Sequence, residues 1–338
     1  MMEDTHISLA HGNGGRYMRE LIEQLFAKHL GNEALDTRAD AAILPWDSAQ
    51  GELVLTTDGF TVQPLEFPGG DIGSLAVHGT TNDLAVSGAT PRYLSLNVFV
   101  EEGFEIVRLE RLTASLARTA RSVGVYVAAG DTKVLRRGEG GGLYLATTGI
   151  GVRPRGVCLG MQHIRPGDCI LVSGPIGAHG IAVLLAREQF GLRGDLQSDA
   201  ASVLPLTTSI RDLLGLRFMR DPTRGGLATV MHEIAADTGL GVTLEEDAIP
   251  VQDPVRSVCE MLGYDPYYLA CEGRVIAVVA EEAAATALAR WRALPAGAAA
   301  CVVGRVEDER HGRVILRTPL GGERYLEELE DDPLPRIC

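Results

Sequence analysis

The sequence has few cysteines, and their arrangement excludes several classes of protein. Six cysteines occur among 338 residues, with no CxxC pair and no spacing typical of a zinc finger. The first five lie in or beside apolar runs, where buried free thiols are the ordinary outcome. The pattern therefore predicts neither a disulfide framework nor a structural metal, and it favours a reducing, cytoplasmic environment.

Positive charge and long apolar runs are also scarce. The chain carries 31 Lys and Arg against 45 Asp and Glu, a formal net charge of −14, and its longest basic cluster is Arg136-Arg137. Nucleic-acid binding normally requires a basic face, so we do not expect it. The most apolar stretch, residues 169–186, is interrupted by polar residues and glycines, and the first residues show no basic segment followed by an apolar one. We therefore expect neither a membrane span nor a secretory signal.

Two common nucleotide-binding motifs are missing, although glycine is abundant. The 40 glycines form no GxGxxG and no GxxxxGK[ST] pattern, which argues against a dinucleotide fold and a P-loop. Three glycine-rich turns remain, at 11–15, 137–142 and 174–180. A glycine-rich turn before a helix offers free backbone N–H groups to an anion. Residues 137–142 are either a cover over phosphates or a hairpin loop, and each turn alone is weak evidence.

The pattern of apolar residues predicts an α+β protein with two domains. A segment rich in arginine and proline, 152–156, is the best candidate for a boundary. We expect an N-terminal domain over 1–153, a C-terminal α+β domain over 154–319 and a mobile tail over 320–338. Helices are predicted over 16–30, 71–88, 105–122, 179–188, 199–214, 226–238 and 281–293. Strands are predicted over 52–57, 92–100, 125–129, 143–150, 168–173, 241–245, 273–280, 301–306 and 313–317.

Several acidic residues lie at predicted strand ends or turns, with glycine or threonine close by. They are Asp40, Asp58, Asp71, Asp83, Asp131 and Asp221. Aspartate beside glycine is ordinary turn chemistry, which explains any one of them. Carboxylates are also the ligands that Mg²⁺ uses together with substrate phosphates. Six in similar settings favour a metal–nucleotide site.

Three further residues are candidates for chemistry. Lys133 follows Asp131 and is either a phosphate-binding or basic group, or a solvated lysine. Glu272 precedes an apolar strand and is either a tuned base or an exposed residue at the strand start. Cys338 ends an acidic, proline-containing segment, where a thiol has no packing role. Because a thiolate is a strong nucleophile, we interpret Cys338 as a carrier of a chemical group.

Four motifs carry a resemblance to a known family. The sequence resembles the ATP-binding superfamily of aminoimidazole ribonucleotide synthetase and selenophosphate synthetase, and the match covers essentially the whole chain. The C-terminal residues 335–338, Pro-Arg-Ile-Cys, are similar to the ending of one branch, the HypE carbamoyl dehydratases of hydrogenase maturation. The four motifs are residues 57–59, 82–89, 130–133 and 221–227.

The resemblance implies a fold, ligands and partners. It implies a PurM-like architecture in which the N-terminal sheet pairs with that of a second copy in a homodimer. ATP and Mg²⁺ would be bound by Asp58, Asn82, Asp83, Asp131, Thr132, Asp221 and Gly225, with Asp40, Asp58, Asp83, Asp131 and Asp221 as metal ligands. A HypF-type carbamoyltransferase would place a carbamoyl group on Cys338, and a HypC–HypD complex would receive the cyano group for the iron of [NiFe] hydrogenase. The glycine turn begins at His11, which departs from the family pattern.

The implied reaction is ATP-dependent dehydration of S-carbamoyl-Cys338 to S-cyano-Cys338, a thiocyanate, with Lys133 and Glu272 as acid–base groups. The tail would have to bring the thiol to ATP, and residues 320–338 span roughly 55 Å at about 3.1 Å per residue. Two alternatives remain. One is another synthetase or kinase of the superfamily, although a selenophosphate synthetase would need an early cysteine and none precedes Cys158. The other is a metallochaperone using Cys338, for which a lone thiol is a poor ligand set.

Overall fold

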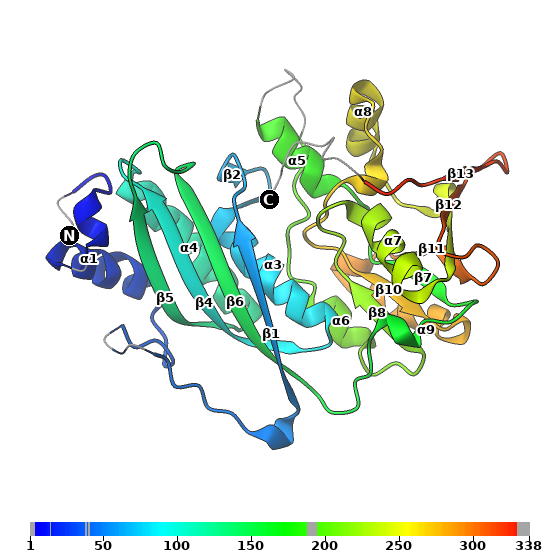
Figure 1. Cartoon of the computed structure of the whole chain (residues 1–338), viewed down its shortest axis with the longest axis horizontal. Helices are drawn as coiled ribbons and strands as arrows, with labels where there is room; N and C mark the ends of the chain where they lie inside the picture. Colours follow the sequence, from blue (N-terminus) through cyan, green and yellow to red (C-terminus); the bar gives the residue numbers. More distant parts are fainter. Residues whose placement is uncertain (1–3, 14, 38, 40, 188–194, 330–338) are drawn as a thin grey trace.

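The computed structural model describes residues 4–13, 15–37, 39, 41–187 and 195–329. Within these ranges the strands form a four-stranded sheet, a seven-stranded sheet and a two-stranded ribbon. The two large sheets lie in separate halves of the molecule, each with its own helices (Figure 1). None of the helices in these ranges is long and apolar enough to cross a membrane. The α+β class is confirmed.

The N-terminal sheet has the strand order β1-β6-β4-β5, in which β4 and β5 are parallel and the other pairs are antiparallel. Helices α3 and α4 lie against one face of this sheet (Figure 1). A short helical segment precedes β1, and the ribbon β2–β3 leads into α3. The bounds are η1 Leu9–Gly12, α1 Arg16–Leu21, η2 Ile22–Ala27, α2 Lys28–Leu30, η3 Ser48–Gln50, β1 Glu52–Phe60, β2 Glu66–Phe67, β3 Gly70–Asp71, α3 Ile72–Val86, β4 Thr90–Glu101, α4 Ile106–Val123, β5 Tyr126–Leu135 and β6 Leu143–Arg153.

The C-terminal sheet has the order β13-β12-β9-β11-β7-β10-β8 and mixes parallel with antiparallel pairs. Strands β7 and β10 are buried at every position, as expected for strands at the centre of a covered sheet. The bounds are η4 Met161–His163, β7 Cys169–Val172, α5 Ala178–Ala186, α6 Leu204–Ile210, β8 Leu216–Arg220, α7 Gly226–Thr238, β9 Gly241–Glu245, η5 Glu246–Ala248, α8 Asp253–Leu262, η6 Pro266–Tyr268, β10 Ile276–Val279, α9 Glu281–Arg292, η7 Pro295–Gly297, β11 Cys301–Glu307, β12 Val314–Arg317 and β13 Glu323–Tyr325.

Side chains of β1 alternate between the two faces of the N-terminal sheet. Thr56, Asp58 and Phe60 point toward α3, and a β-carbon built on Gly79 of that helix would lie 2.8 Å from the Phe60 ring and 3.3 Å from the Asp58 carboxylate. The alternate residues Leu53 and Leu55 lie on the opposite face and are 55% and 68% exposed. We call this opposite face the outer face of the sheet. Two large aliphatic side chains in water are unfavourable for an isolated chain and indicate a contact surface.

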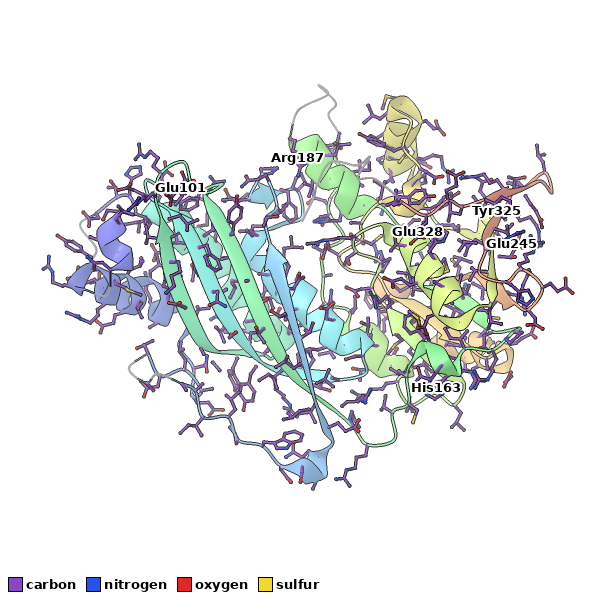
Figure 2. The ribbon with its side chains drawn as sticks, in the orientation of Figure 1. Glu101, His163, Arg187, Glu245, Tyr325 and Glu328 are labelled. Atoms are coloured by element: carbon purple, nitrogen blue, oxygen red, sulfur yellow. The ribbon has the colours of Figure 1, made fainter. Side chains whose placement is uncertain are left out.

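The structure differs from the sequence expectations at several places. Helix α6 covers only 204–210 of the predicted 199–214, and β8, α8 and β13 were not predicted. The 137–142 loop is not a hairpin, because β5 and β6 are separated by β4 in the sheet. Glu101, labelled in Figure 2, accepts hydrogen bonds from the amides of Gly138 at 2.5 Å and Gly142 at 3.1 Å, which fix both ends of this loop.

The expected arm over 320–338 also differs, because its first residues belong to the C-terminal sheet. Strand β13 pairs with β12, and Leu326 just after it is 1% exposed. Of the predicted tail, residues 330–338 lie outside the described residues.

Candidate functional site

Four carboxylates meet at the junction of the two halves, and we call them the acid cluster. Asp58 on β1 and Asp83 on α3 come from the N-terminal half. Asp221 directly follows β8, and Glu272 lies four residues before β10, in the C-terminal half. Asp221 and Glu272 are 7% and 5% exposed. The cluster thus combines acids that lie up to 214 positions apart in the sequence.

Hydrogen bonds from neighbouring residues bring the four acids together. The side-chain amide of Asn82 donates to the carbonyls of Ala201 at 3.0 Å and Glu272 at 3.1 Å, and its oxygen accepts from the amide of Val203 at 2.9 Å. These three bonds dock the end of α3, and with it Asp83, onto the C-terminal half. Within that half, the amide of Cys271 donates to the carbonyl of Pro222 at 2.9 Å, which places Glu272 beside the Asp221 loop.

The acid cluster holds protons more tightly than ordinary carboxyl groups do. Burial, and next the charge of Asp83, raise the pKa of Asp221 to about 7. Burial, and then the charges of Asp221 and Asp199, raise the pKa of Glu272 well above its usual value. Burial also raises the pKa of Asp58 and of Asp83, although Thr56 donates a hydrogen bond to Asp83 that opposes the shift. Near pH 7 Asp221 therefore exchanges between its protonated and ionised forms, as acid–base chemistry requires.

A cavity of about 440 Å³ opens onto this cluster. Asp83 and Asp221 line it together with the cationic side chains of Arg153 and Arg220. The charge of Arg220 partly offsets the rise in the pKa of both acids, and that of Arg224 partly offsets the rise in the pKa of Asp58. Carboxylates next to arginines suit a ligand that carries both phosphates and a bound cation.

The carboxylates fit a magnesium ion only when a ligand supplies the remaining oxygens. Within the described residues, no three His, Cys, Asp or Glu side chains converge closely enough to hold a metal ion by themselves. Mg²⁺ usually takes one or two carboxylates and completes its shell with phosphate oxygens and water. Buried, mutually repelling acids beside a cavity match that kind of site. Asp40 lies outside the described residues.

The other predicted residues form a second group on the outer face of the sheet. Asp131 and Lys133 on β5 are exposed there and form an ion pair of 2.8 Å, which lowers the pKa of Asp131. Strand β5 lies at the opposite sheet edge from β1, three strand spacings or about 14 Å away. Thr132, between the two, is buried. Within one chain, the structure therefore does not bring Asp131 and Lys133 to the acid cluster.

The N-terminal glycine turn also contacts β5, but from the other face. A β-carbon built on Gly12 would lie 2.8 Å from the side chain of Val134, which packs against the covered core and not on the face of Lys133. His11 is buried, and its Nδ1 accepts a hydrogen bond from the amide of Ser8 at 3.1 Å. We call residues 131–133 the outer group, after the face on which Asp131 and Lys133 lie.

Asp71 and Gly225 have defined roles in helix ends. Asp71 caps α3 by accepting a hydrogen bond from the amide of Ser74 at 2.9 Å, and its second oxygen accepts from Ser115 at 2.6 Å. It lies twelve residues before Asp83, or about 18 Å along the helix, so it does not join the acid cluster. Gly225 caps α7 with a φ of 71°, a left-handed conformation that favours glycine.

Sequence reasoning missed two side chains that support the site. Thr56, two positions before Asp58 and on the same face of β1, donates to Asp83 at 2.9 Å. Asp199 is fully buried, accepts from the amide of Glu272 at 3.2 Å and pairs with Arg274 at 3.3 Å. The alternation along β1 could have identified Thr56. No local pattern marks Asp199, because its role depends on contacts made across the fold.

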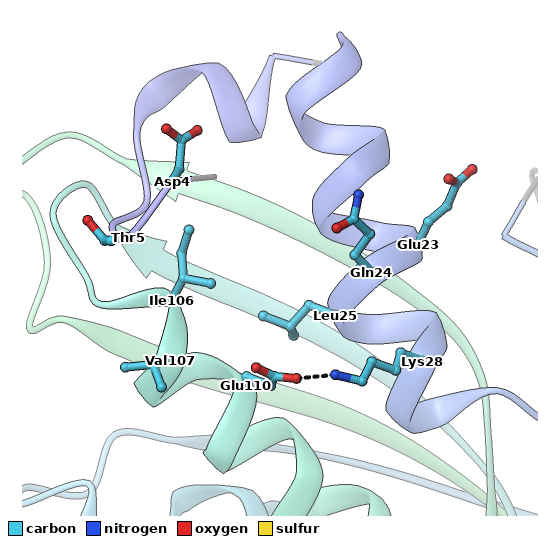
Figure 3. Close-up of a pocket in the computed structure, with 9 residues that line it drawn as sticks. All are labelled: Asp4, Thr5, Glu23, Gln24, Leu25, Lys28, Ile106, Val107 and Glu110. Carbon is cyan, nitrogen blue, oxygen red and sulfur yellow. Dashed lines mark hydrogen bonds and ion pairs between the residues drawn. The ribbon is translucent and has the colours of Figure 1, made fainter. Parts of the chain in front are cut away.

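A larger cavity of about 580 Å³ lies elsewhere, between the N-terminal helices and α4 (Figure 3). Lys28 and Glu110 form a 2.5 Å ion pair across its floor. It contains no residue that the sequence predicted for the site. Its lining residues are Asp4, Thr5, Glu23, Gln24, Leu25, Lys28, Ile106, Val107 and Glu110.

Comparison with known proteins identifies the family and the fold. Residues 38–153 match the family model for the N-terminal domain of AIR synthase related proteins, and residues 165–317 match the model for their C-terminal domain. The carbamoyl dehydratase HypE of Azotobacter vinelandii is 46% identical over 338 residues, which cover 100% of this chain and 98% of that protein. The chain belongs to the HypE family of carbamoyl dehydratases.

Solved HypE structures share this fold. The crystal structure of HypE in complex with ATP has a TM-score of 0.92 and 43% sequence identity, covering 98% of this chain and 99% of that one. A HypE–HypF complex has a TM-score of 0.80 and 40% identity, covering 91% of this chain and 99% of that chain. The two-domain architecture expected from the sequence is thereby confirmed.

Proposed function

We propose that this chain uses ATP to dehydrate a carbamoyl group on its own Cys338 to a cyano group, supplying cyanide ligands for the iron of [NiFe] hydrogenase. The observation that carries the proposal is the position of Leu329, the last residue that the structure describes. A β-carbon built on Gly225 would lie 3.5 Å from Cδ1 of Leu329. Gly225 follows Asp221 by four residues, so the chain leading to Cys338 passes beside the acid cluster.

The chemistry explains why such a site needs ATP. An S-carbamoyl group, R–S–C(=O)–NH₂, becomes R–S–C≡N only if the oxygen and both amide hydrogens leave. Oxide is a very poor leaving group. Transfer of the γ-phosphoryl group of ATP to that oxygen lets it leave as phosphate, and the products are the thiocyanate, ADP and phosphate. The protein must therefore position phosphates against the thiocarboxamide and remove two protons from nitrogen.

The acid cluster and its surroundings support binding of magnesium and ATP. Asp58, Asp83 and Asp221 would hold Mg²⁺ together with phosphate oxygens, and Mg²⁺ would neutralise charge that develops on the transferred phosphoryl group. The N-terminus of α7, capped by Gly225, presents the positive end of a helix dipole, which favours binding of phosphates. We expected Asn82 to contact the ligand. In the structure its side chain makes three hydrogen bonds that dock the two halves.

Glu272 is our candidate for proton removal from the amide nitrogen. It is buried beside Asp221, and burial together with the charges of Asp221 and Asp199 raises its pKa, so it binds a proton more readily than an exposed glutamate does. Lys133 remains our second candidate. It cannot act on the same substrate from the outer face of its own chain, so its assignment depends on how two chains assemble.

A homodimer through the outer face would place the outer group of one chain at the acid cluster of the other. The exposed Leu53 and Leu55 support this assembly, because they lie on the same face as Asp131 and Lys133. Each site would then take Asp58, Asp83, Asp221 and Glu272 from one chain, and Asp131, Thr132 and Lys133 from its partner.

The family relationship also supports the proposed partners. The solved HypE–HypF complex makes a HypF-type carbamoyltransferase the proposed donor of the carbamoyl group. A HypC–HypD complex is the proposed acceptor of the cyano group, which would become a ligand of the iron. We propose that these steps take place in the cytoplasm. The domain limits 1–153 and 154–319 are likewise retained as a proposal.

The intact mass of the C-terminal peptide tests the proposal. Carbamoylated protein is incubated with Mg²⁺ and either ATP or no nucleotide, and we expect loss of one water, about 18 Da, only with ATP. If the peptide has the same mass with and without ATP, the proposed dehydration is refuted. The chain would then be either a different ATP-dependent synthetase or a metallochaperone. Metal titration and ATPase measurements then separate those two.

A further inference from the structure

The segment 323–327 is fastened to the C-terminal half along its length. Strand β13 pairs with β12, and just beyond it the amide of Leu326 donates to the carbonyl of Val314 at 3.0 Å. The Leu326 side chain is buried in the same core as Leu227 and Met231 of α7. A segment held by strand pairing and by a buried Leu326 does not act as a free tether.

Two side chains hold the backbone carbonyls at the end of this segment. Nε2 of His232, on α7, lies 2.8 Å from the carbonyl oxygen of Leu326. Because a carbonyl oxygen only accepts, this nitrogen carries the proton. The hydroxyl of Tyr268 donates to the carbonyl oxygen of Glu327 at 2.6 Å. Neither bond belongs to the sheet, and together they continue the attachment beyond β13.

The attachment directs the chain toward the acid cluster. In Figure 2, Tyr325 lies at the outer edge of the C-terminal half and Glu328 lies closer to the junction of the two halves. Leu329 then reaches Gly225, at the start of α7. His232 lies on the same helix, so one element positions both the end of the fastened segment and the loop of Asp221.

We propose that His232 and Tyr268 are positioning residues that fix where the cysteine-bearing tail leaves the protein. The inference rests on the proposed function and adds the device that makes Cys338 a substrate of its own chain. With the attachment intact, nine residues separate Leu329 from the chain end. If the chain came free from Arg317 onward, 21 residues would follow instead.

Chain length sets the expected size of the effect. The effective concentration of a tethered group falls roughly as the −3/2 power of tether length, so an increase from nine to 21 residues lowers it about three- to fourfold. Any nine-residue segment reaches at most about 30 Å when fully extended. Release would also move the origin of the tether from Gly225 to the sheet edge, which lowers the rate further.

The test compares dehydration within the chain with dehydration of a separate substrate. The double variant His232→Ala with Tyr268→Phe is carbamoylated on Cys338, and the single-turnover rate is measured at saturating ATP. The same double variant carrying Cys338→Ala is given a carbamoylated peptide of residues 330–338. We expect the rate within the chain to fall at least three- to fourfold, while the rate on the peptide and the dissociation constant for ATP stay at parental values.

Two controls separate positioning from general damage. His232→Gln retains a donor for the Leu326 carbonyl and should restore most of the rate, while Tyr325→Phe removes a hydroxyl from the same segment and should have no effect. Deuterium uptake at the Leu326 amide shows whether segment 323–327 has detached from the C-terminal half. The variant Leu326→Asn provides a second way to detach this segment. The proposal would be overturned if the dehydration rate on Cys338 stayed unchanged although the segment around Leu326 had detached. It would also be overturned if the rate on the separate peptide fell by the same factor as the rate on Cys338. Failure of the parental protein to lose water with ATP would instead refute the proposed function.

Discussion

The hydroxyl of Thr56 donates a 2.9 Å hydrogen bond to the carboxylate of Asp83, joining β1 to the end of α3. This bond orients one of the proposed magnesium ligands. We predict that Asp83→Asn lowers ATP turnover by at least about tenfold, while Cys338 still accepts a carbamoyl group. Thr56→Ser should keep near-parental turnover, and Thr56→Val should lower it by less than Asp83→Asn does. Parental ATP hydrolysis by Asp83→Asn would remove this residue from the site.

Cys338 is expected to be needed for chemistry and not for folding. Cys338→Ala should melt at the parental temperature and should bind ATP with parental affinity. It should accept no carbamoyl group from the transferase, as measured by intact mass, whereas Cys158→Ala should accept it normally. A cyano product formed on the Cys338→Ala protein would refute the carrier role.

Asp221 makes the stability of the protein depend on pH. The pKa of Asp221 is about 7 in the folded protein, against 3.8 for an unperturbed aspartate. Between these values the folded state holds a proton that the unfolded chain has released, so the free energy of unfolding falls as pH rises from about 4 to about 7. Asp221→Asn removes this loss and should stabilise the protein above pH 7 by up to about 4 kcal/mol, from 1.36 kcal/mol per pKa unit.

Urea unfolding at several pH values, without nucleotide or Mg²⁺, measures this effect. The difference between Asp221→Asn and the parent should be near zero at pH 4 and should reach its full size by pH 8. The exposed Asp247 provides the control, and Asp247→Asn should leave the free energy of unfolding unchanged across the range. A stability difference independent of pH would contradict the assigned cause.

The composite site predicts that two inactive variants rescue each other. Asp83→Asn damages the acid cluster, and Lys133→Ala damages the outer group. When equal amounts are mixed and allowed to exchange subunits, half of the dimers contain one chain of each kind, and each of those has one intact site. Activity should recover to about 25% of the parental value. If each chain builds its whole site alone, mixing restores nothing.

Asn82 should be among the most sensitive polar residues. Asn82→Ala removes three buried hydrogen bonds between the two halves and leaves backbone groups of residues 201, 203 and 272 without them. We expect a loss of about 2–4 kcal/mol in the free energy of unfolding, measured with urea. Asn82→Asp keeps the acceptor, loses both donated bonds and adds a charge near the acid cluster, so it should be at least as harmful. A loss below about 1 kcal/mol would contradict this account.

Local patterns in the sequence were sufficient for most of the fold and for part of the site. The helices at 72–86, 106–123 and 226–238 follow from apolar spacing, and Gly124 and Gly239 end two of them with positive φ. Helix α8 was missed although Val255, Val258 and Cys259 have helical spacing and Gly263 ends the run. The predicted helix over 199–214 was too long because Asn82 engages the backbone of residues 201 and 203, which stays outside α6.

The placement of the acids depended on information that the sequence does not carry locally. Alternation along β5 puts Asp131 and Lys133 on one face, but only the packed helices show that this face is opposite to Asp58. The pairing of β13 with β12 could not be predicted either, because three exposed residues give no apolar pattern. In both cases the role of a residue depends on which face of the sheet other elements cover, and this is decided by packing between distant parts of the chain.

The three hydrogen bonds of Asn82 also link catalytic competence to the integrity of the junction. Asp83 is the next residue, so any opening that breaks these bonds carries one carboxylate away from Glu272. Warming should therefore abolish turnover before either sheet melts, and the enzyme should lose its activity at a temperature below its calorimetric transition. Cooling should restore it, since both halves would still be folded and need only dock again.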